Sequence, residues 1–591
     1  MRDEIPRVAQ VALRRLAPDL LIENGMLIDV YSGRLLPAHT VAVADGLVAW
    51  TGPAVEAPEP GSSTVVIEAG GAFISPGFVD AHGHGEFLVT PTELAAAILP
   101  LGTTAMLSDT HDLVCALGEL GLDMFLKTTA SIPFRYYLTL PLHCPPEPEI
   151  EGRDLLPLER VAAYAGHPRV LSVSEIFAWP RLLQGDPVML AKLDSARRAG
   201  LRAEGHTPGC SADRLAALAG LGLTSCHESV TEDDVLERLR FGYWTMLRSG
   251  SIRSDLPQLA GAITGNPGLD TSRFILTPDW VSPQDVLRRG YLDHVVGLAV
   301  ERGIPAVTAV QMATLNPATY LGLDGRLGGL APGRVADVLI IDDLARPRPR
   351  AVICRGRLVA EHGRLREQER ESSVSMGAVP ISSWPAVRVP ADPVEPGHFV
   401  LEGGRSCSAA ELPVIFMKNK TITRLEYQRV ALSNGVIQDR PDLLLASIWS
   451  ASTGGWLTVP LGGFGAGVGG VVLSAVHENG VPLVVGNDPA DMAVAVRRMK
   501  EIGGGVIIAD GGRVVCELPL DVGGVMSTLP FAEVAALMDG VNRYLQERGC
   551  PFDDPFFGLN FLSFTGLPYA RLTPEGVYET GRGLVGYPLV C

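Results

Sequence analysis

The stretch Ile74-Ser-Pro-Gly-Phe-Val-Asp-Ala-His-Gly-His84 is the strongest fold signal in the chain. A short apolar run ends in two histidines that stand two residues apart, His82 and His84. On an extended strand, residues i and i+2 point to the same face, so both imidazoles can chelate one metal ion. An isolated His-x-His pair is more often two unrelated surface histidines. Here the preceding strand pattern and further histidines at other strand ends favour a metal site.

Apolar runs typical of strands alternate with helical stretches over residues 72–325. The runs are 78–79, 104–107, 136–138, 171–173, 201–203, 223–225, 243–247 and 274–276. Eight strand–helix units over about 250 residues predict an α/β fold, a (β/α)8 TIM-like barrel. In that fold the chemistry lies at the C-terminal ends of the strands, so the residues that follow each run are the candidates for the site.

The segments around the barrel predict further domains. Residues 19–71 and 326–362 contain strands, and we expect them to form a small β-sandwich-like domain built from the N-terminal and post-barrel segments. Within it, Asn24-Gly25 and Asp45-Gly46 each predict a tight hairpin turn. Residues 363–398 are rich in charge, Ser and Pro and predict a linker. Residues 399–591 alternate strands and helices and predict a C-terminal α+β domain.

Composition limits the partners and the compartment. The formal charge is −17 and there is no basic run, so nothing favours nucleic acid. The most apolar region, 459–485, is interrupted by glycines and by His477, and does not predict a membrane span. Nine cysteines without a Cys-x-x-Cys fit reduced thiols, and the charged N-terminus does not resemble a signal peptide. We expect a cytoplasmic homo-oligomer with a small-molecule substrate.

Strand-end positions carry the side chains that could perform chemistry. They are His82 and His84, His111, Glu175, His206, and His227 with Glu228. Four of these histidines and one carboxylate, each on a different strand or in a pair on one strand, suit two divalent metal ions, and a single carboxylate can bridge them. Two such ions about 3.5–4 Å apart can hold a bridging hydroxide that is nucleophilic at neutral pH. For Glu175 alone, a structural ion pair at the barrel mouth is the alternative.

A family resemblance extends over most of the chain. The matching segments are 76–84 with Glu86, 102–104, 109–112, 174–175, 205–209, 226–228, 248–251 and 312–317, with weaker matches through 399–591. They resemble the amidohydrolase superfamily and, within it, the bacterial adenine deaminases. The resemblance implies that a binuclear metal centre is held by His82, His84, Glu175, His206 and His227.

The chain departs from that family where its eighth strand ends. The family carries Thr-Asp-Asp there, whereas this chain has Thr277-Pro278-Asp279-Trp280. A strand that simply continued would turn Asp279 away from the centre, and a bulge at the proline would turn it inward, so both remain open. Asp279 is therefore a candidate both as a metal ligand and as an acid–base group. The family's His-Asp-Ser-His-Asn run is also reduced, to residues 477–480.

The resemblance implies a metal-dependent hydrolase that deaminates adenine to hypoxanthine and ammonia through a metal-bridged hydroxide. Two divalent ions are expected, manganese or iron, with zinc as a further candidate. The candidates for proton transfer are Asp279, Glu228, His111 and Glu86, and those for substrate binding are Arg248 and Ser251. The alternatives are an amidohydrolase acting on another C–N bond, in a cyclic amide or other heterocycle, and a non-catalytic paralogue.

Overall fold

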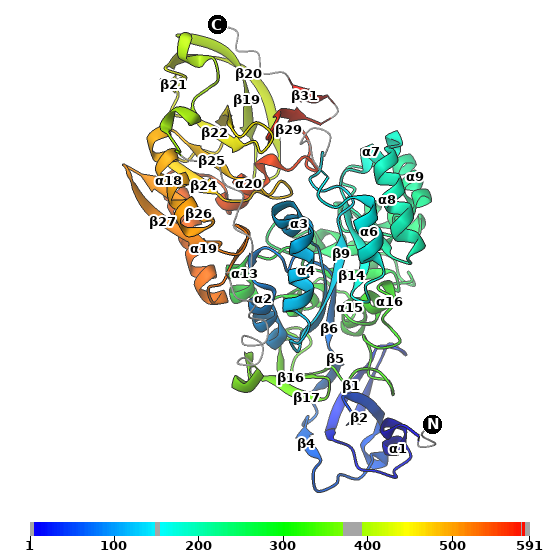
Figure 1. Ribbon diagram of the computed structural model, residues 1–591. Coiled ribbons are helices and arrows are strands. Elements are labelled where there is room, and N and C mark those ends of the chain that lie inside the picture. The colour runs from blue at the N-terminus through cyan, green and yellow to red at the C-terminus, as the bar shows by residue number, and fades with distance from the viewer. Residues whose placement is uncertain (1–4, 148–153, 370–392, 581, 586–591) are drawn as a thin grey trace.

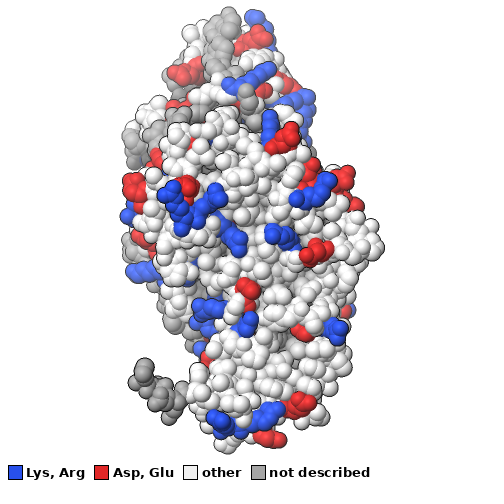
Figure 2. Space-filling model, turned by 90° about the vertical axis from the view of Figure 1, so that its right-hand side faces the viewer, with Lys and Arg blue, Asp and Glu red and all other residues white. Residues whose placement is uncertain are grey.

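The computed structural model describes residues 5–147, 154–369, 393–580 and 582–585. Three parts follow one another along the long axis of the molecule in Figure 1. A β-rich part that contains the N-terminus lies at one end, a barrel lies in the middle, and the C-terminal part lies at the other end. On the face shown in Figure 2, acidic and basic side chains are interspersed and neither sign forms a large patch.

The middle part is the predicted barrel. Its strands are β6 (Phe78–Gly83), β8 (Thr103–Ser108), β9 (Arg135–Leu140), β10 (Val170–Ile176), β11 (Arg202–Gly205), β12 (Ser225–Cys226), β13 (Trp244–Arg248) and β14 (Phe274–Thr277). Neighbouring strands pair in parallel in chain order, and a parallel bridge between Gly83 and Asp279 links the last strand to the first. Each of the eight predicted runs overlaps one of these strands, so the predicted fold class is confirmed.

Helices cover the outside of the barrel, because strands buried on both faces need an apolar layer around them. They are α2 (Pro91–Ile98), α3 (His111–Leu117), α4 (Glu119–Thr128), α6 (Leu158–Ala165), α7 (Trp179–Gln184), α8 (Pro187–Arg198), α9 (Ala212–Leu221), α10 (Glu232–Arg240), α11 (Leu256–Leu259), α12 (Gly261–Thr264), α13 (Pro283–Arg289), α14 (Leu292–Glu301), α15 (Ala306–Met312) and α16 (Leu315–Tyr320). Strand β6 is buried along its whole length, as this arrangement requires.

A mixed sheet joins the segments on both sides of the barrel in sequence. Its strands are β1 (Leu20–Asp29), β2 (Arg34–Ala44), β3 (Leu47–Pro53), β4 (Val65–Glu68), β5 (Phe73–Pro76), β15 (Val338–Ile341), β16 (Pro349–Cys354), β17 (Arg357–Glu361) and β18 (Arg364–Leu365). The antiparallel pairing of β5 with β15 connects the N-terminal strands to those that follow the barrel. Helix α1 (Arg7–Ala12) packs against β3.

One of the two predicted hairpin turns is right and the other is wrong. Asp45 and Gly46 connect β2 to β3 with positive φ angles of 51° and 73°, as a tight hairpin requires. In contrast, Asn24 and Gly25 lie inside the continuous strand β1. The pairing register with β2 shifts on both sides of Gly25, and Asn24 has a φ of 56°. Because a β-bulge uses the same left-handed conformation as a turn, the dipeptide here marks a bulge.

The C-terminal part contains a nine-stranded sheet among its described residues. Its strands are β19 (Ala409–Met417), β20 (Thr423–Ser433), β21 (Val436–Gln438), β22 (Leu443–Trp449), β23 (Trp456–Gly462), β24 (Gly470–Leu473), β25 (Leu483–Gly486), β26 (Gly505–Asp510) and β27 (Arg513–Pro519). Helices α18 (Pro489–Ile502), α19 (Phe531–Glu547) and α20 (Pro555–Asn560) and a small sheet, β29 (Ala570–Thr573), β30 (Gly576–Glu579) and β31 (Gly583–Val585), complete it. Residues 370–392 of the expected linker lie outside the described residues.

Strand pairing and helix packing both attach the C-terminal part to the barrel. Strand β28 (Met526–Ser527) pairs in parallel with β7 (Leu88–Val89), which follows the first barrel strand. Helix α19 packs against α13, and the two lie next to each other in Figure 1. The C-terminal part is thereby held beside the mouth of the barrel.

The described residues also bear on the predictions for membrane and redox state. Within the described ranges, none of the helices combines the length and the apolar character needed to cross a lipid bilayer. Cys210, Cys226, Cys354, Cys516 and Cys550 are free thiols, as predicted. Cys407 is disulfide-bonded, so the prediction of reduced thiols is wrong at that position.

Candidate metal centre and cavity

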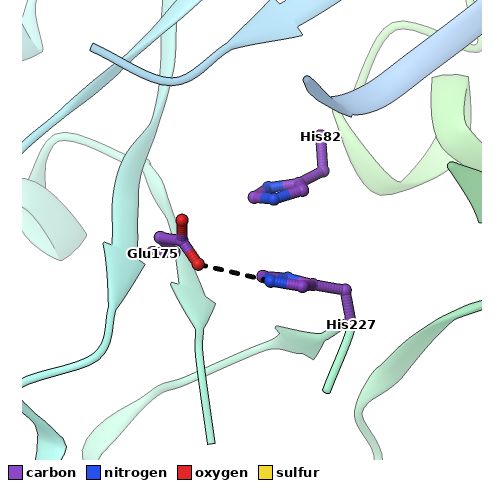
Figure 3. A group of neighbouring side chains, drawn as sticks. All are labelled: His82, Glu175 and His227. Carbon is purple, nitrogen blue, oxygen red and sulfur yellow. Dashed lines mark ion pairs between the residues drawn. The ribbon is translucent and has the colours of Figure 1, made fainter. Parts of the chain in front are cut away.

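Six side chains converge where the barrel strands end. His82 lies on β6 and His84 just beyond it, Glu175 lies on β10, and His206, His227 and Asp279 follow β11, β12 and β14. His84 is partly buried and the other five are buried. Figure 3 shows His82, Glu175 and His227 pointing toward one another from β6, from β10 and from the segment that follows β12. The structure thus brings together every residue that the sequence proposed as a metal ligand.

The six side chains form two adjoining groups. In the first, Asp279 Oδ1 lies 3.4 Å from His82 Nε2 and 3.2 Å from His84 Nε2. In the second, Glu175 Oε2 lies 2.6 Å from His206 Nδ1 and 3.3 Å from His227 Nε2. The rings of His82 and His227 stack across the boundary with centroids 4.1 Å apart. Ligand atoms of His82, Glu175 and His227 all lie within 4.8 Å of one another, so Glu175 can serve both groups.

The polar atoms at the centre fit divalent cations. Among the described residues, His82 Nε2 and His206 Nε2 are buried and have no hydrogen-bond partner. Buried polar atoms in native proteins are nearly always paired, so two unpaired imidazole nitrogens in one cluster call for a missing partner. Imidazole nitrogen and carboxylate oxygen are the usual ligands of zinc, iron and manganese. The residues present therefore fit a metal centre.

The local backbone turns Asp279 toward the two histidines of β6. Strand β14 ends at Thr277, and Pro278 cannot donate a hydrogen bond to continue the sheet. Asp279 then adopts a left-handed φ of 61°, a conformation that is uncommon outside glycine and that Asp and Asn tolerate best. The Asp279 amide donates to Thr277 Oγ1 at 3.0 Å, which stabilises this turn. Of the two orientations left open by the sequence, the inward one is found.

A buried arginine organises the carboxylates at the mouth. The Arg248 guanidinium donates to Glu228 Oε1 at 2.5 Å and to Asp279 Oδ2 at 2.8 Å. Burial disfavours the charged form of Glu228, but Arg248 outweighs it, together with His206 and His227, and lowers the Glu228 pKa to about 2. Glu228 is therefore ionised at neutral pH and can accept a proton but has none to donate.

The other predicted catalytic and substrate-binding residues do not face the cavity. Glu86 Oε1 lies 3.1 Å from His84 Nδ1, and burial raises the Glu86 pKa to about 7 although His84 opposes the shift. His111 Nδ1 lies 3.1 Å from Asp109 Oδ1, and both residues are buried. The Ser251 hydroxyl donates to Asp285 Oδ2 at 2.6 Å. None of Glu86, His111 and Ser251 is among the described residues that line the cavity.

Sequence reasoning missed Glu204, which contacts the ring nitrogen of His82 that faces away from the centre. Glu204 lies on β11 and its Oε2 is 3.3 Å from His82 Nδ1, which leaves Nε2 directed toward the centre. A carboxylate on the distal nitrogen of a metal-bound histidine fixes the tautomer and raises ligand basicity. The available signal was the spacing of two from His206, because residues i and i+2 of a strand share a face.

We expect Glu204→Gln to weaken metal affinity about 10–100-fold, the usual effect of removing such a supporting carboxylate. Metal content after dialysis against graded chelator would measure the loss. Asp491→Asn is the matched control, because Asp491 is a buried carboxylate that accepts from Gly511 and Gly512 within the C-terminal part. Equal metal retention by the Glu204 variant and the unchanged protein would show that His82 is oriented by other contacts.

A cavity of about 890 Å³ lies over the centre and is enclosed by both halves of the chain. Its floor includes His84, Glu175, His206, His227 and Asp279. The C-terminal half contributes the following lining residues: residues 418–422, His477, 551–553, Phe557, Asn560, Phe561, Phe564, Leu567 and Pro568. These C-terminal lining residues form the roof of the cavity. His477 Nδ1 lies 2.9 Å from Asp112 Oδ2, and the Glu478 amide donates to Asp112 Oδ1 at 2.8 Å, so the roof is hydrogen-bonded directly to the barrel.

Comparisons with known proteins agree with this architecture. The model of the amidohydrolase family matches residues 73–359, and that of the adenine deaminase C-terminal domain matches residues 420–583. An adenine deaminase of Moorella thermoacetica is 33% identical over 588 residues, which cover 96% of this chain and 95% of the relative. The chain belongs to the adenine deaminase family of amidohydrolases. The predicted family membership is therefore confirmed.

Further members of the adenine deaminase family show similar agreement over nearly their whole length. An adenine deaminase of Rubrobacter xylanophilus is 34% identical, with 97% of this chain and 95% of the relative covered. One of Cenarchaeum symbiosum is 30% identical, with 98% and 94% covered. Among solved structures, a molinate hydrolase superposes with a TM-score of 0.44 at 16% identity, covering 64% of this chain and 99% of that structure.

Proposed function

We propose that the protein is a metal-dependent aminohydrolase that converts adenine and water to hypoxanthine and ammonia. The observation that carries this proposal is the two-part cluster at the end of the barrel, in which Asp279 lies beside His82 and His84, and Glu175 lies beside His206 and His227. Within it, His82 Nε2 and His206 Nε2 lack hydrogen-bond partners. Its relatives of similar length are named adenine deaminases. A small heterocycle is the substrate that such an enclosed, largely apolar site would take.

We propose two divalent ions, manganese or iron with zinc as a further candidate, held by His82, His84 and Asp279 and by Glu175, His206 and His227. When bound, such ions supply a water molecule that is activated at neutral pH and polarise the reacting group. Deamination then requires one water proton to reach the leaving amine, and the water oxygen replaces that amine on the ring carbon.

Asp279 is the residue best placed to move that proton. Its Oδ2 is held by Arg248, while its Oδ1 faces the histidines at the floor. We propose that Oδ1 takes the proton and delivers it to the amine, and that Arg248 fixes the orientation of the carboxylate. Glu228, ionised and also bound to Arg248, is the second candidate.

Glu86 and His111 would act as positioning residues, since Glu86 contacts His84 and His111 contacts Asp109. Ser251, bonded to Asp285, would shape the loop that follows β13 rather than bind substrate. Arg248 lines the cavity and remains our candidate for a substrate contact. The cytoplasmic location and the homo-oligomer remain predictions.

A second candidate function is hydrolysis of another C–N bond, in a cyclic amide or other heterocycle, on the same centre. The altered end of the eighth strand favours it, because Trp280 lines the cavity directly after Asp279. A non-catalytic paralogue is less consistent with the chain, because all five ligand positions predicted from the family resemblance are kept and lie in one cluster.

The test is a substrate screen of protein stripped with chelator and reloaded separately with manganese, ferrous iron and zinc. We expect ammonia release from adenine that depends on the added metal. Ammonia from a cyclic amide but not from adenine would support the second candidate. A chain that binds none of the three metals would contradict both enzymatic proposals and favour the non-catalytic one.

A further inference from the structure

The wall of the cavity above the charged floor is aromatic. Phe557, Phe561 and Phe564 come from the C-terminal half, and Trp280 comes from the barrel. The ring centroids of Trp280 and Phe557 are 3.7 Å apart, those of Phe557 and Phe561 5.2 Å, and those of Phe561 and Phe564 6.1 Å. Phe564 in turn lies 6.2 Å from the ring of His206. A continuous row of rings therefore runs along the wall from Trp280, which follows Asp279, to Phe564 beside His206.

Several of the charged groups around this wall already neutralise one another. Lys420 Nζ lies 3.0 Å from Asp553 Oδ2 and donates to the Ser251 carbonyl at 3.1 Å. Arg253 donates to Glu228 Oε2 at 3.1 Å and to Asp255 Oδ1 at 3.0 Å. Because Lys420 and Arg253 are already paired, the ring faces are the main apolar surface that the wall offers to a ligand.

The volume of the cavity exceeds what a bare base can fill. About 890 Å³ lies near the upper end of the roughly 300–1,000 Å³ found for pockets that enclose drug-sized ligands. A bicyclic base bound at the floor would leave part of this volume, and the apolar lining around it, uncovered. Apolar surface in such a position gains free energy when a ligand group covers it.

We propose that the cavity takes an aminopurine-like heterocycle that carries an apolar, aromatic substituent on the ring edge remote from the amine. This inference rests on the proposed function, because it places the amine at the floor and the substituent along the row of four rings. A sugar is a poorer occupant, since its hydroxyl groups would lose hydrogen bonds to water against ring faces that offer none in return.

Three probes on the manganese-loaded full chain test the inference: adenine, adenosine and 9-benzyladenine. We expect 9-benzyladenine to bind about 10–100-fold more tightly than adenine, the gain from burying one aromatic group, and adenosine to gain nothing. Equal or tighter binding of adenine or adenosine would overturn the inference. Ammonia release is measured separately. Tight binding of the benzyl probe without ammonia from any probe would overturn the proposed function but not the size preference.

Two variants locate the effect in the cavity wall. Phe557→Leu and Phe561→Leu keep an apolar side chain but remove the ring face, so the dissociation constant for 9-benzyladenine should rise about 3–10-fold, clearly more than that for adenine. Phe556→Leu is the matched control, because Phe556 lies on the same helix α20 and does not line the cavity. A parallel loss for adenine, or the same loss in the control, would contradict the assignment. Unchanged circular dichroism and metal content would establish that the variants fold.

Discussion

Replacing Glu175 with glutamine should leave at most one tightly held metal ion per chain. Glu175 Oε2 is close to both His206 and His227 and belongs to the group that also contains His82, so one carboxylate compensates charge on both sides. Removing one partner from a buried charged cluster costs roughly 3–5 kcal/mol, because the remaining charges stay buried and uncompensated. Elemental analysis of the purified variant, reloaded with manganese and freed of excess ion, would measure the stoichiometry.

Glu478→Gln is a suitable control for this variant. Glu478 is also a buried glutamate, and burial raises its pKa well above the ordinary value, with Cys115 and Asp112 adding to the shift. This burial favours the neutral carboxyl group, which an amide closely replaces. We expect the control to keep both ions. Two tightly held ions in the Glu175 variant would show that this residue does not bridge the centre.

Asp279→Asn should keep the metal centre and slow the chemical step by about 10²–10⁴-fold, the usual scale for a positioned acid–base group. Asparagine retains an oxygen that can face His82 and His84, and it tolerates the left-handed φ of 61° as well as aspartate does. What it lacks is a carboxylate that can take up a proton. Single-turnover ammonia release together with metal content would separate the chemical step from metal loss.

Turnover close to normal in the Asp279 variant would mean that another group moves the proton, with Glu228 as the next candidate. Asp279→Ala is a useful companion, because alanine removes the oxygen and is strained in the left-handed region. We expect the alanine variant to lose metal as well as rate. Equal metal content in the two variants would indicate that Asp279 is not a ligand.

The barrel could be predicted because its strands can be recognised from short stretches of sequence. Each strand is a short apolar run, and the rule that chemistry follows the strand ends selected His82, Glu175, His206 and His227 without any knowledge of tertiary contacts. A short stretch of sequence was not sufficient at Asn24-Gly25. A bulge and a hairpin turn need the same backbone conformation, and only the neighbouring strand decides between them.

The orientation of Asp279 and the role of Glu204 needed the structure. Alternation along a strand predicts facing only while the strand continues, and at Pro278 the chain leaves it. The contact between Glu204 and His82 joins residues 122 positions apart, on strands that do not pair directly with each other. The contact between the cavity roof and the barrel could not be predicted either, because His477 and Asp112 are 365 positions apart in the sequence.

Because Asp112 is hydrogen-bonded to His477 and to the Glu478 amide, the barrel and the C-terminal half are held together around one cavity. The barrel supplies the candidate metal centre at the floor of the cavity, and the C-terminal half sets the shape and polarity of the space above it. A barrel severed from its partner would expose that floor to bulk water. Exchange of the C-terminal half between related genes would, in contrast, change the shape and polarity of the cavity while leaving the residues at its floor unchanged.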